Sequence, residues 1–147
     1  MIDRLSIEKK YNSEVVDRID ETGFLRLGKG QHSERLDLFM FALGLGVKAG
    51  VRTPISTKHG LILATTVENN AEAMAAIFSL WIQEAIMTNQ EDKLDDRDLA
   101  FQLAEEYANT GFMILAEYLK TPNLPNIHVF IKEMDNRYKE CFPEEEI

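Results

Sequence analysis

The apolar residues between positions 34 and 49 repeat with the period of an α-helix. One stripe has apolar side chains at i, i+3, i+4, i+7 and i+11, namely Leu36, Phe39, Met40, Leu43 and Val47. Leu38, Phe41 and Leu45 fill the opposite side, so we predict a central helix over 34–49 that is covered on all sides. Ser33 is suited to cap its start and Gly50 to end it.

Four further segments show the same period. A helix is predicted over 71–88, capped by Asn69 or Asn70, with an apolar stripe of Met74, Ile77, Phe78, Trp81, Ile82 and Ala85. The polar segment 89–96 predicts a loop. The long segment 96–120 predicts a helix with a broad inner face, which includes Leu99, Leu103, Tyr107, Gly111 and Leu115. Shorter helices are predicted over 13–22 and 126–141, and residues 142–147 are expected to form a frayed acidic tail.

Two short segments alternate apolar and polar residues instead. Leu5 and Ile7 alternate with charged or polar neighbours, as do Leu25 and Leu27. The sequence therefore leaves open whether one or two short strands form near the N-terminus. Residues 61–67, LILATTV, are compatible with a strand or with the start of a helix. No repeat or linker divides the 147 residues. The predicted fold is therefore mainly α, a single domain over 1–147 with about five helices around 34–49.

The stretch Gly44 to Ala49 also has the outline of a G-x-G-x-x-A dinucleotide-binding loop. Such a loop needs a helix directly after its glycines, whereas residues 49–60 contain Gly50, Pro54 and Gly60 and have no apolar period. We therefore interpret the glycines as helix residues. Ala42, Gly46 and Gly50 lie four apart, which predicts a face that another helix can approach closely, within the chain or from a second subunit.

The charged residues are unevenly distributed along the chain. The net charge is −9, but residues 1–53 have a balance of +1 and residues 54–147 a balance of −10. Five basic residues gather near the predicted central helix and are the candidates for a nucleic-acid contact: Arg26, Lys29, Arg35, Lys48 and Arg52. An acidic chain is a poor free-standing DNA binder, because affinity for phosphate depends on basic contacts.

Composition narrows the class of protein further. The single cysteine, Cys141, excludes an internal disulfide framework and a thiolate zinc site. The longest apolar run, Leu38–Val47, is ten residues, against the roughly 20 that cross a bilayer. The N-terminal segment mixes charged and apolar residues, unlike a signal peptide. We expect a cytoplasmic protein without a membrane contact.

No catalytic constellation emerges from the motifs. The three histidines are far apart in the sequence and none stands in a metal-binding pattern, so no metal or cofactor is expected. Glu105 and Glu106 are a carboxylate pair, but adjacent helix residues point about 100° apart. We predict that they lie on a solvated helix edge and do not form one site. An enzyme would have to assemble its site across subunits, with Glu105, Glu106 and His59 as participants.

Two segments resemble a bacterial protein family. DLFMFALGLGVKAGVRTPI is similar to the family's run of Phe-Met, small residues and a Lys-x-Gly close. VENNAEAMAAIFSLWI followed by EEYANTGF is similar to its Glu-Asn helix entry and its Glu-Glu-Tyr-Ala-Asn-Gly-Gly signature, here Glu105, Glu106, Tyr107, Ala108, Asn109 and Gly111. These are small helical proteins associated with DNA phosphorothioation (Dnd) gene clusters. The resemblance covers about 36–119, and Thr110 replaces a usual glycine.

The resemblance implies an accessory role in a DNA modification or restriction system that serves in defence, and it carries over no catalytic residue. Our first hypothesis is a non-enzymatic protein that binds other proteins of that system, with a homodimer as a reasonable state. A direct DNA-binding module that uses the basic N-terminal third is the first alternative. An enzyme with a site shared between subunits is the second.

Overall fold

The structure is a computed structural model that describes residues 2–17 and 35–120. Its elements, in chain order, are β1 (Arg4–Glu8), the π-helix η1 (Asn12–Val16), α2 (Arg35–Ala49), β2 (Lys58–Leu63), α3 (Ala64–Glu68), α4 (Ala71–Met87), the 3-10 helix η2 (Glu91–Lys93) and α5 (Arg97–Leu119). The described part is mainly helical with one two-stranded antiparallel sheet, so the predicted fold class is confirmed.

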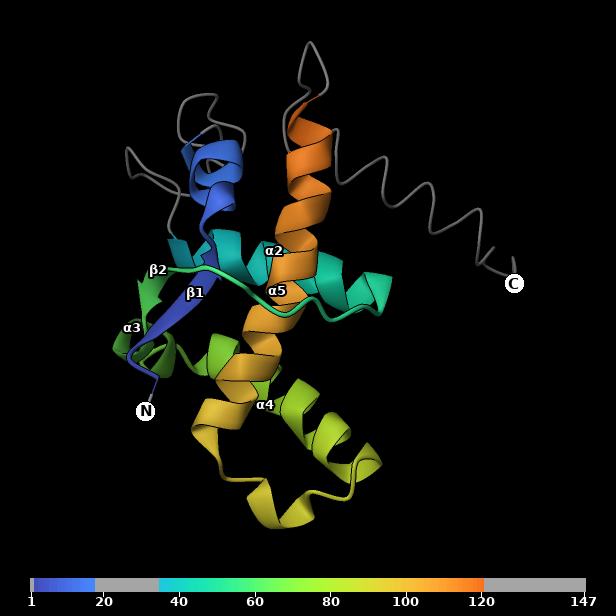
Figure 1. Cartoon of the computed structure of the whole chain (residues 1–147). Helices are drawn as coiled ribbons and strands as arrows, with labels where there is room; N and C mark the ends of the chain where they lie inside the picture. Colours follow the sequence, from blue (N-terminus) through green and yellow to red (C-terminus); the bar gives the residue numbers. More distant parts are fainter. Residues whose placement is uncertain (1, 18–34, 121–147) are drawn as a thin grey trace, which may run out of the picture.

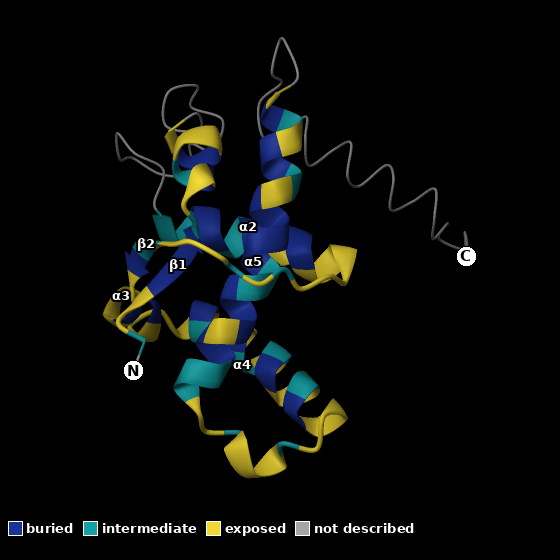
Figure 2. Ribbon diagram, in the orientation of Figure 1, coloured by how far each residue is buried: buried dark blue, intermediate teal, exposed yellow. Residues whose placement is uncertain are grey.

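The long helix α5 is the element on which the others assemble (Figure 1). It contacts α2, α4, β1 and η1. Its buried residues extend along its whole length, from Ala100 and Phe101 to Leu119, and the burial continues into α2 where the two helices cross (Figure 2). Apolar residues line so much of α5 because elements pack on several sides of it.

Among the described residues, α2 is covered on one side, so the prediction that it is covered all round is wrong. Leu38, Phe39 and Ala42 are buried, but Gly44 and Val47 are exposed. Met40, Leu43 and Val47 of the first apolar stripe, together with Gly44, border a groove between α2 and α4. The apolar period therefore identified the helix correctly, but only part of its apolar surface is used within the described structure.

The crossing of α2 and α5 brings two backbones into direct contact. A Cβ atom at Gly46 would lie 1.8 Å from the carbonyl oxygen of Tyr107, and one at Gly111 would lie 1.7 Å from that of Ala42. Both glycines are therefore required by the approach of the other helix. The partner of the Ala42 and Gly46 face is internal.

Gly50 has a different role from Ala42 and Gly46. Its φ is +70°, a left-handed conformation that favours glycine, and a Cβ atom there would have no neighbour within 4 Å. Its N–H donates to the carbonyl oxygens of Gly46 and Val47, both at 3.0 Å. Gly50 thus ends α2, as a residue just past a helix often does, and the packing prediction does not apply to it.

The sheet explains the two ambiguous segments. β1 pairs antiparallel with β2 from Arg4–Leu63 to Glu8–Lys58, with an irregularity between Leu5 and Ser6. Leu5 and Ile7 are fully buried in β1, so the short strand that the sequence left open here does form. Residues 61–67 are part strand and part helix, because β2 ends at Leu63 and α3 begins at Ala64.

The helices predicted over 71–88 and 96–120 are confirmed as α4 and α5. The Asn70 side chain accepts from the Ala73 N–H at 2.9 Å, and the Asp96 side chain accepts from the Leu99 N–H at 3.2 Å. Helical turns also occur over 10–17, which overlaps the start of the short helix predicted over 13–22. The end of that helix, the Leu25–Leu27 segment, the Ser33 cap, the 126–141 helix and the 142–147 tail lie outside the described residues.

Replacing Gly46 with alanine should destabilise the fold. The added Cβ would collide with the Tyr107 carbonyl and force α2 and α5 apart, at an expected cost of about 1–3 kcal/mol or more. Urea unfolding followed by circular dichroism measures this loss.

Gly44→Ala is the matched control, since the new Cβ has no neighbour within 4 Å. It should raise the free energy of unfolding, by up to about 1 kcal/mol from helix propensity. Equal stabilities of the two variants would contradict the close crossing.

Candidate functional site

The signature segment Glu105–Gly111 holds residues 50–57 against α5. The side-chain amide of Asn109 donates to the Thr53 carbonyl at 3.0 Å, and the Thr53 N–H donates to the Glu106 carbonyl at 3.1 Å. The Thr110 hydroxyl donates to the Val51 carbonyl at 2.8 Å and lies 2.7 Å from Oγ1 of Thr53. Thr110, the departure from the family pattern, is thus one of the residues that fix this segment.

The charges of this segment are also paired. Arg52 donates from Nη2 to Oε1 of Glu106 at 2.8 Å and from Nη1 to Oε1 of Glu84 on α4 at 2.9 Å. One guanidinium therefore joins the 50–57 segment to two helices. Tyr107 and Gly111 lie at the crossing with α2, and Ala108 is fully buried. Every residue of the signature has a contact within the chain, which explains its composition.

Glu105 is buried, so its predicted place on a solvated helix edge is wrong. Its side chain is 3% exposed, and Oε2 accepts the Ser6 N–H of β1 at 2.7 Å. The reason is that β1 packs over this part of α5, where the Ser6 N–H needs an acceptor. Burial raises the pKa of the Glu105 carboxyl, while the Ser6 N–H and the positive charge of Lys58 oppose the rise.

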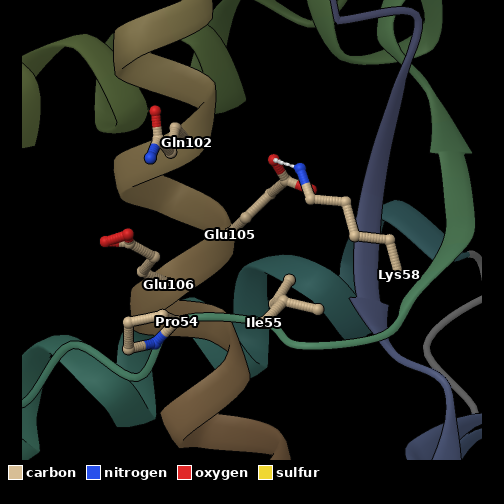
Figure 3. A pocket seen from close by; sticks show the side chains of 6 residues that line it. All are labelled: Pro54, Ile55, Lys58, Gln102, Glu105 and Glu106. Carbon is tan, nitrogen blue, oxygen red and sulfur yellow. Dashed lines mark ion pairs between the residues drawn. The ribbon is translucent and has the colours of Figure 1, made fainter.

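A pocket of about 90 Å³ lies over Glu105 (Figure 3). The six residues that line it are Pro54, Ile55, Lys58, Gln102, Glu105 and Glu106. Glu105 points toward Lys58, whose Nζ atom is 3.9 Å from Oε1, while Glu106 points to the other side of α5. The two glutamates point apart on α5, as predicted for adjacent helix residues, although both border this pocket.

The structure does not bring His59 into this pocket. His59 follows Lys58 on β2, and successive strand residues point to opposite faces of a sheet. Lys58 and Gln102 were missed from the sequence. Gln102 precedes Glu106 by four residues, so helix spacing alone places the two side chains on the same face of α5. The approach of Lys58 depends instead on strand pairing, which the sequence does not show.

A second concave surface lies between α2 and α4. This α2–α4 groove has a volume of about 300 Å³ and is lined by Met40, Leu43, Gly44, Val47, Ala76, Ser79, Leu80 and Gln83. No charged side chain lines it. Met87, 79% exposed, follows Leu80 and Gln83 on the same face of α4 and extends that wall.

The five basic residues singled out for nucleic acid do not form one described patch. Arg26 and Lys29 lie outside the described residues. Arg35 and Lys48 stand near opposite ends of α2, thirteen residues and therefore about 20 Å apart along the helix. The Arg52 guanidinium is engaged by two glutamates. The DNA-binding hypothesis stays a prediction.

Among residues 2–17 and 35–120, no three side chains of the types His, Cys, Asp and Glu gather closely enough to hold a metal ion. No helix within the same ranges is both long and apolar enough to cross a membrane.

The fold and site define a small, mainly helical protein whose signature segment joins α5 to α2 and to residues 50–57. A family model matches residues 13–146, and the chain belongs to this family, the DNA sulphur modification system-associated protein 4 family. The suspected resemblance is confirmed, and the match extends well beyond 36–119 at both ends. The family's description associates the chain with a DNA sulphur modification system. No curated protein and no solved structure matches it.

Replacing Glu105 with glutamine should change the pH dependence of stability. Glutamine keeps an acceptor for the Ser6 N–H but cannot ionise. The folded-state pKa of Glu105 is raised above the ordinary glutamate value of 4.5, so the native protein binds this proton more tightly than the unfolded chain. The wild-type protein should therefore lose stability relative to Glu105→Gln as pH rises from 4.5 through the raised pKa.

Urea unfolding from pH 3.5 to pH 8 measures the difference between the two proteins. Glu72→Gln, at an exposed position on α4, controls for the removal of any one carboxylate. A difference between wild type and Glu105→Gln that is constant over the whole pH range would contradict the raised pKa.

Proposed function

We propose that this chain is a non-enzymatic, cytoplasmic accessory protein that binds another protein of the DNA sulphur modification system through the α2–α4 groove. The observation that carries the proposal is Gly44. It lies in the middle of α2 and borders the groove, and a Cβ atom there would meet nothing within 4 Å. Gly44 therefore contributes no packing within the described structure.

A glycine inside a helix costs about 1 kcal/mol relative to alanine. At Gly46 the contact with Tyr107 accounts for that cost, but at Gly44 no internal contact does. An open glycine beside an apolar groove lets the backbone of another chain approach α2 closely. An amphipathic helix that lays its apolar side chains in a groove is a common mode of protein recognition. The occupant we propose is such a helix of a partner protein.

The arrangement of the signature supports a role without catalysis. Arg52, Glu106, Asn109 and Thr110 are occupied in holding residues 50–57, and Glu105 accepts a backbone N–H of β1. These contacts serve the architecture of the protein. The groove, in contrast, is apolar, with neither an acid nor a base on its lining.

Gly44→Leu should abolish partner binding without unfolding the protein. The leucine side chain would extend into open space and occupy the groove, while leucine is a good helix former. Each protein of the sulphur modification system of the same genome is co-expressed with the tagged chain in defined pairs. We expect at least one pair to co-purify, and Gly44→Leu to weaken that complex at least tenfold, which is about 1.4 kcal/mol.

Met113→Gln is the control, because Met113 is a half-exposed apolar residue on α5 away from the groove. It should leave the complex intact. A folded Gly44→Leu variant that still binds its partner with wild-type affinity would refute the groove as the interface. Light scattering distinguishes a homodimer: if Gly44→Leu converts a dimer to a monomer and no pair co-purifies, the occupant is a second copy of this chain.

A further inference from the structure

Two buried oxygen atoms on α5 accept no hydrogen bond from the described residues. They are Oε1 of Glu105 and Oδ1 of Asn109, which lie one helical turn apart. A buried acceptor without a donor loses its hydration without compensation, so such atoms commonly mark the position of a ligand or a water. Oε1 of Glu105 belongs to a side chain that is 3% exposed and lines the 90 Å³ pocket.

Lys58 does not satisfy this oxygen. Its Nζ atom lies 3.9 Å from Oε1, which is beyond hydrogen-bond distance, and its side chain is 59% exposed. The ammonium therefore lies at the mouth of the pocket, largely hydrated. It attracts the Glu105 carboxylate but leaves the interior of the pocket to another group.

The lining of the pocket selects the charge and size of that group. Glu105 and Glu106 are carboxylates and Gln102 adds an amide oxygen, while Pro54 and Ile55 are suited to an aliphatic stem. An anion would meet the Glu105 carboxylate, while Glu106 is already ion-paired with Arg52. A metal ion would find only two carboxylate ligands, next to the positive charge of Lys58. A volume of 90 Å³ holds a few waters or one small polar head group.

We infer that this pocket is a binding site for a guanidinium group on an aliphatic stem, with the Glu105 carboxylate as its charge partner and Lys58 as an intramolecular competitor. A guanidinium is favoured over an ammonium because it is planar, more weakly hydrated and able to donate several hydrogen bonds in one plane. It would supply the donor that Oε1 of Glu105 lacks. The inference goes beyond the proposed function, since it concerns a different surface and needs no partner protein for its test.

The site is tested by titrating the isotope-labelled full chain with methylguanidinium and following the side-chain amide of Gln102 by NMR. We expect saturable shifts at Gln102 that are weaker with n-butylammonium. Lys58→Met, which removes the competitor but keeps the length of the side chain, should tighten binding severalfold. Glu105→Gln, which keeps the Ser6 contact, should weaken it about tenfold or more. Glu72→Gln should behave as wild type.

The opposite effects of the two pocket variants are the decisive result. If methylguanidinium causes no saturable shift in wild type or in Lys58→Met, or if Glu105→Gln binds as well as Lys58→Met, the inference is overturned. An intact wild-type-like spectrum of each variant excludes unfolding as the cause of lost binding. Gly44→Leu should bind methylguanidinium like wild type, so failure at the groove and failure at this pocket are distinguishable.

A guanidinium can come from an arginine of a bound protein or from a free small molecule. Glu105→Gln in the co-purification experiment separates these sources. Reduced retention of the partner, with Glu72→Gln unaffected, identifies an arginine side chain of that protein. Unchanged retention, together with a positive titration, identifies a free guanidinium compound.

Discussion

The contact of two helix backbones at the α2–α5 crossing is the constraint on which the rest of the structure depends. Gly46 lies against the carbonyl of Tyr107, and Gly111 against that of Ala42, so the two backbones come into close contact at these glycines. This geometry fixes which side of α2 faces α5, and hence which side faces outward. It also places residues 50–57, which follow α2 directly, across α5 within reach of Asn109 and Thr110.

The signature segment combines packing contacts and polar contacts, and its sequence alone does not show which residue makes which contact. Gly111 admits α2, Asn109 and Thr110 fix residues 50–57, and Glu105 accepts the Ser6 N–H of β1. A motif rich in glutamate, tyrosine and asparagine suggests chemistry at first sight. Here most of its polar atoms bind the chain itself. Glu105 is the exception, because one of its two buried carboxylate oxygens accepts no hydrogen bond from the described residues.

The α2–α4 groove and the pocket over Glu105 differ in character and so suit different ligands. The α2–α4 groove is apolar and borders an open glycine, whereas the pocket over Glu105 is small and lined by carboxylates. A helix of a partner protein buries apolar surface, which favours the groove. A compact cation gains from a desolvated carboxylate, which favours the pocket. Membership of a family associated with DNA sulphur modification is consistent with a protein that acts through such contacts.

The sequence by itself determined the helices α2, α4 and α5 and the family, because hydrophobic period, caps and motif order are local properties. It left the strand at Leu5 and Ile7 open. It could not determine that Glu105 is buried, that Lys58 approaches it or that one side of α2 stays open. Those features depend on which helix face meets which neighbour. Gly44 and Gly46 are two residues apart in the sequence, yet Gly44 lies on an open surface and Gly46 contacts the backbone of α5. Only the crossing with α5 decides between them, because side-chain surroundings arise from residues distant in the chain.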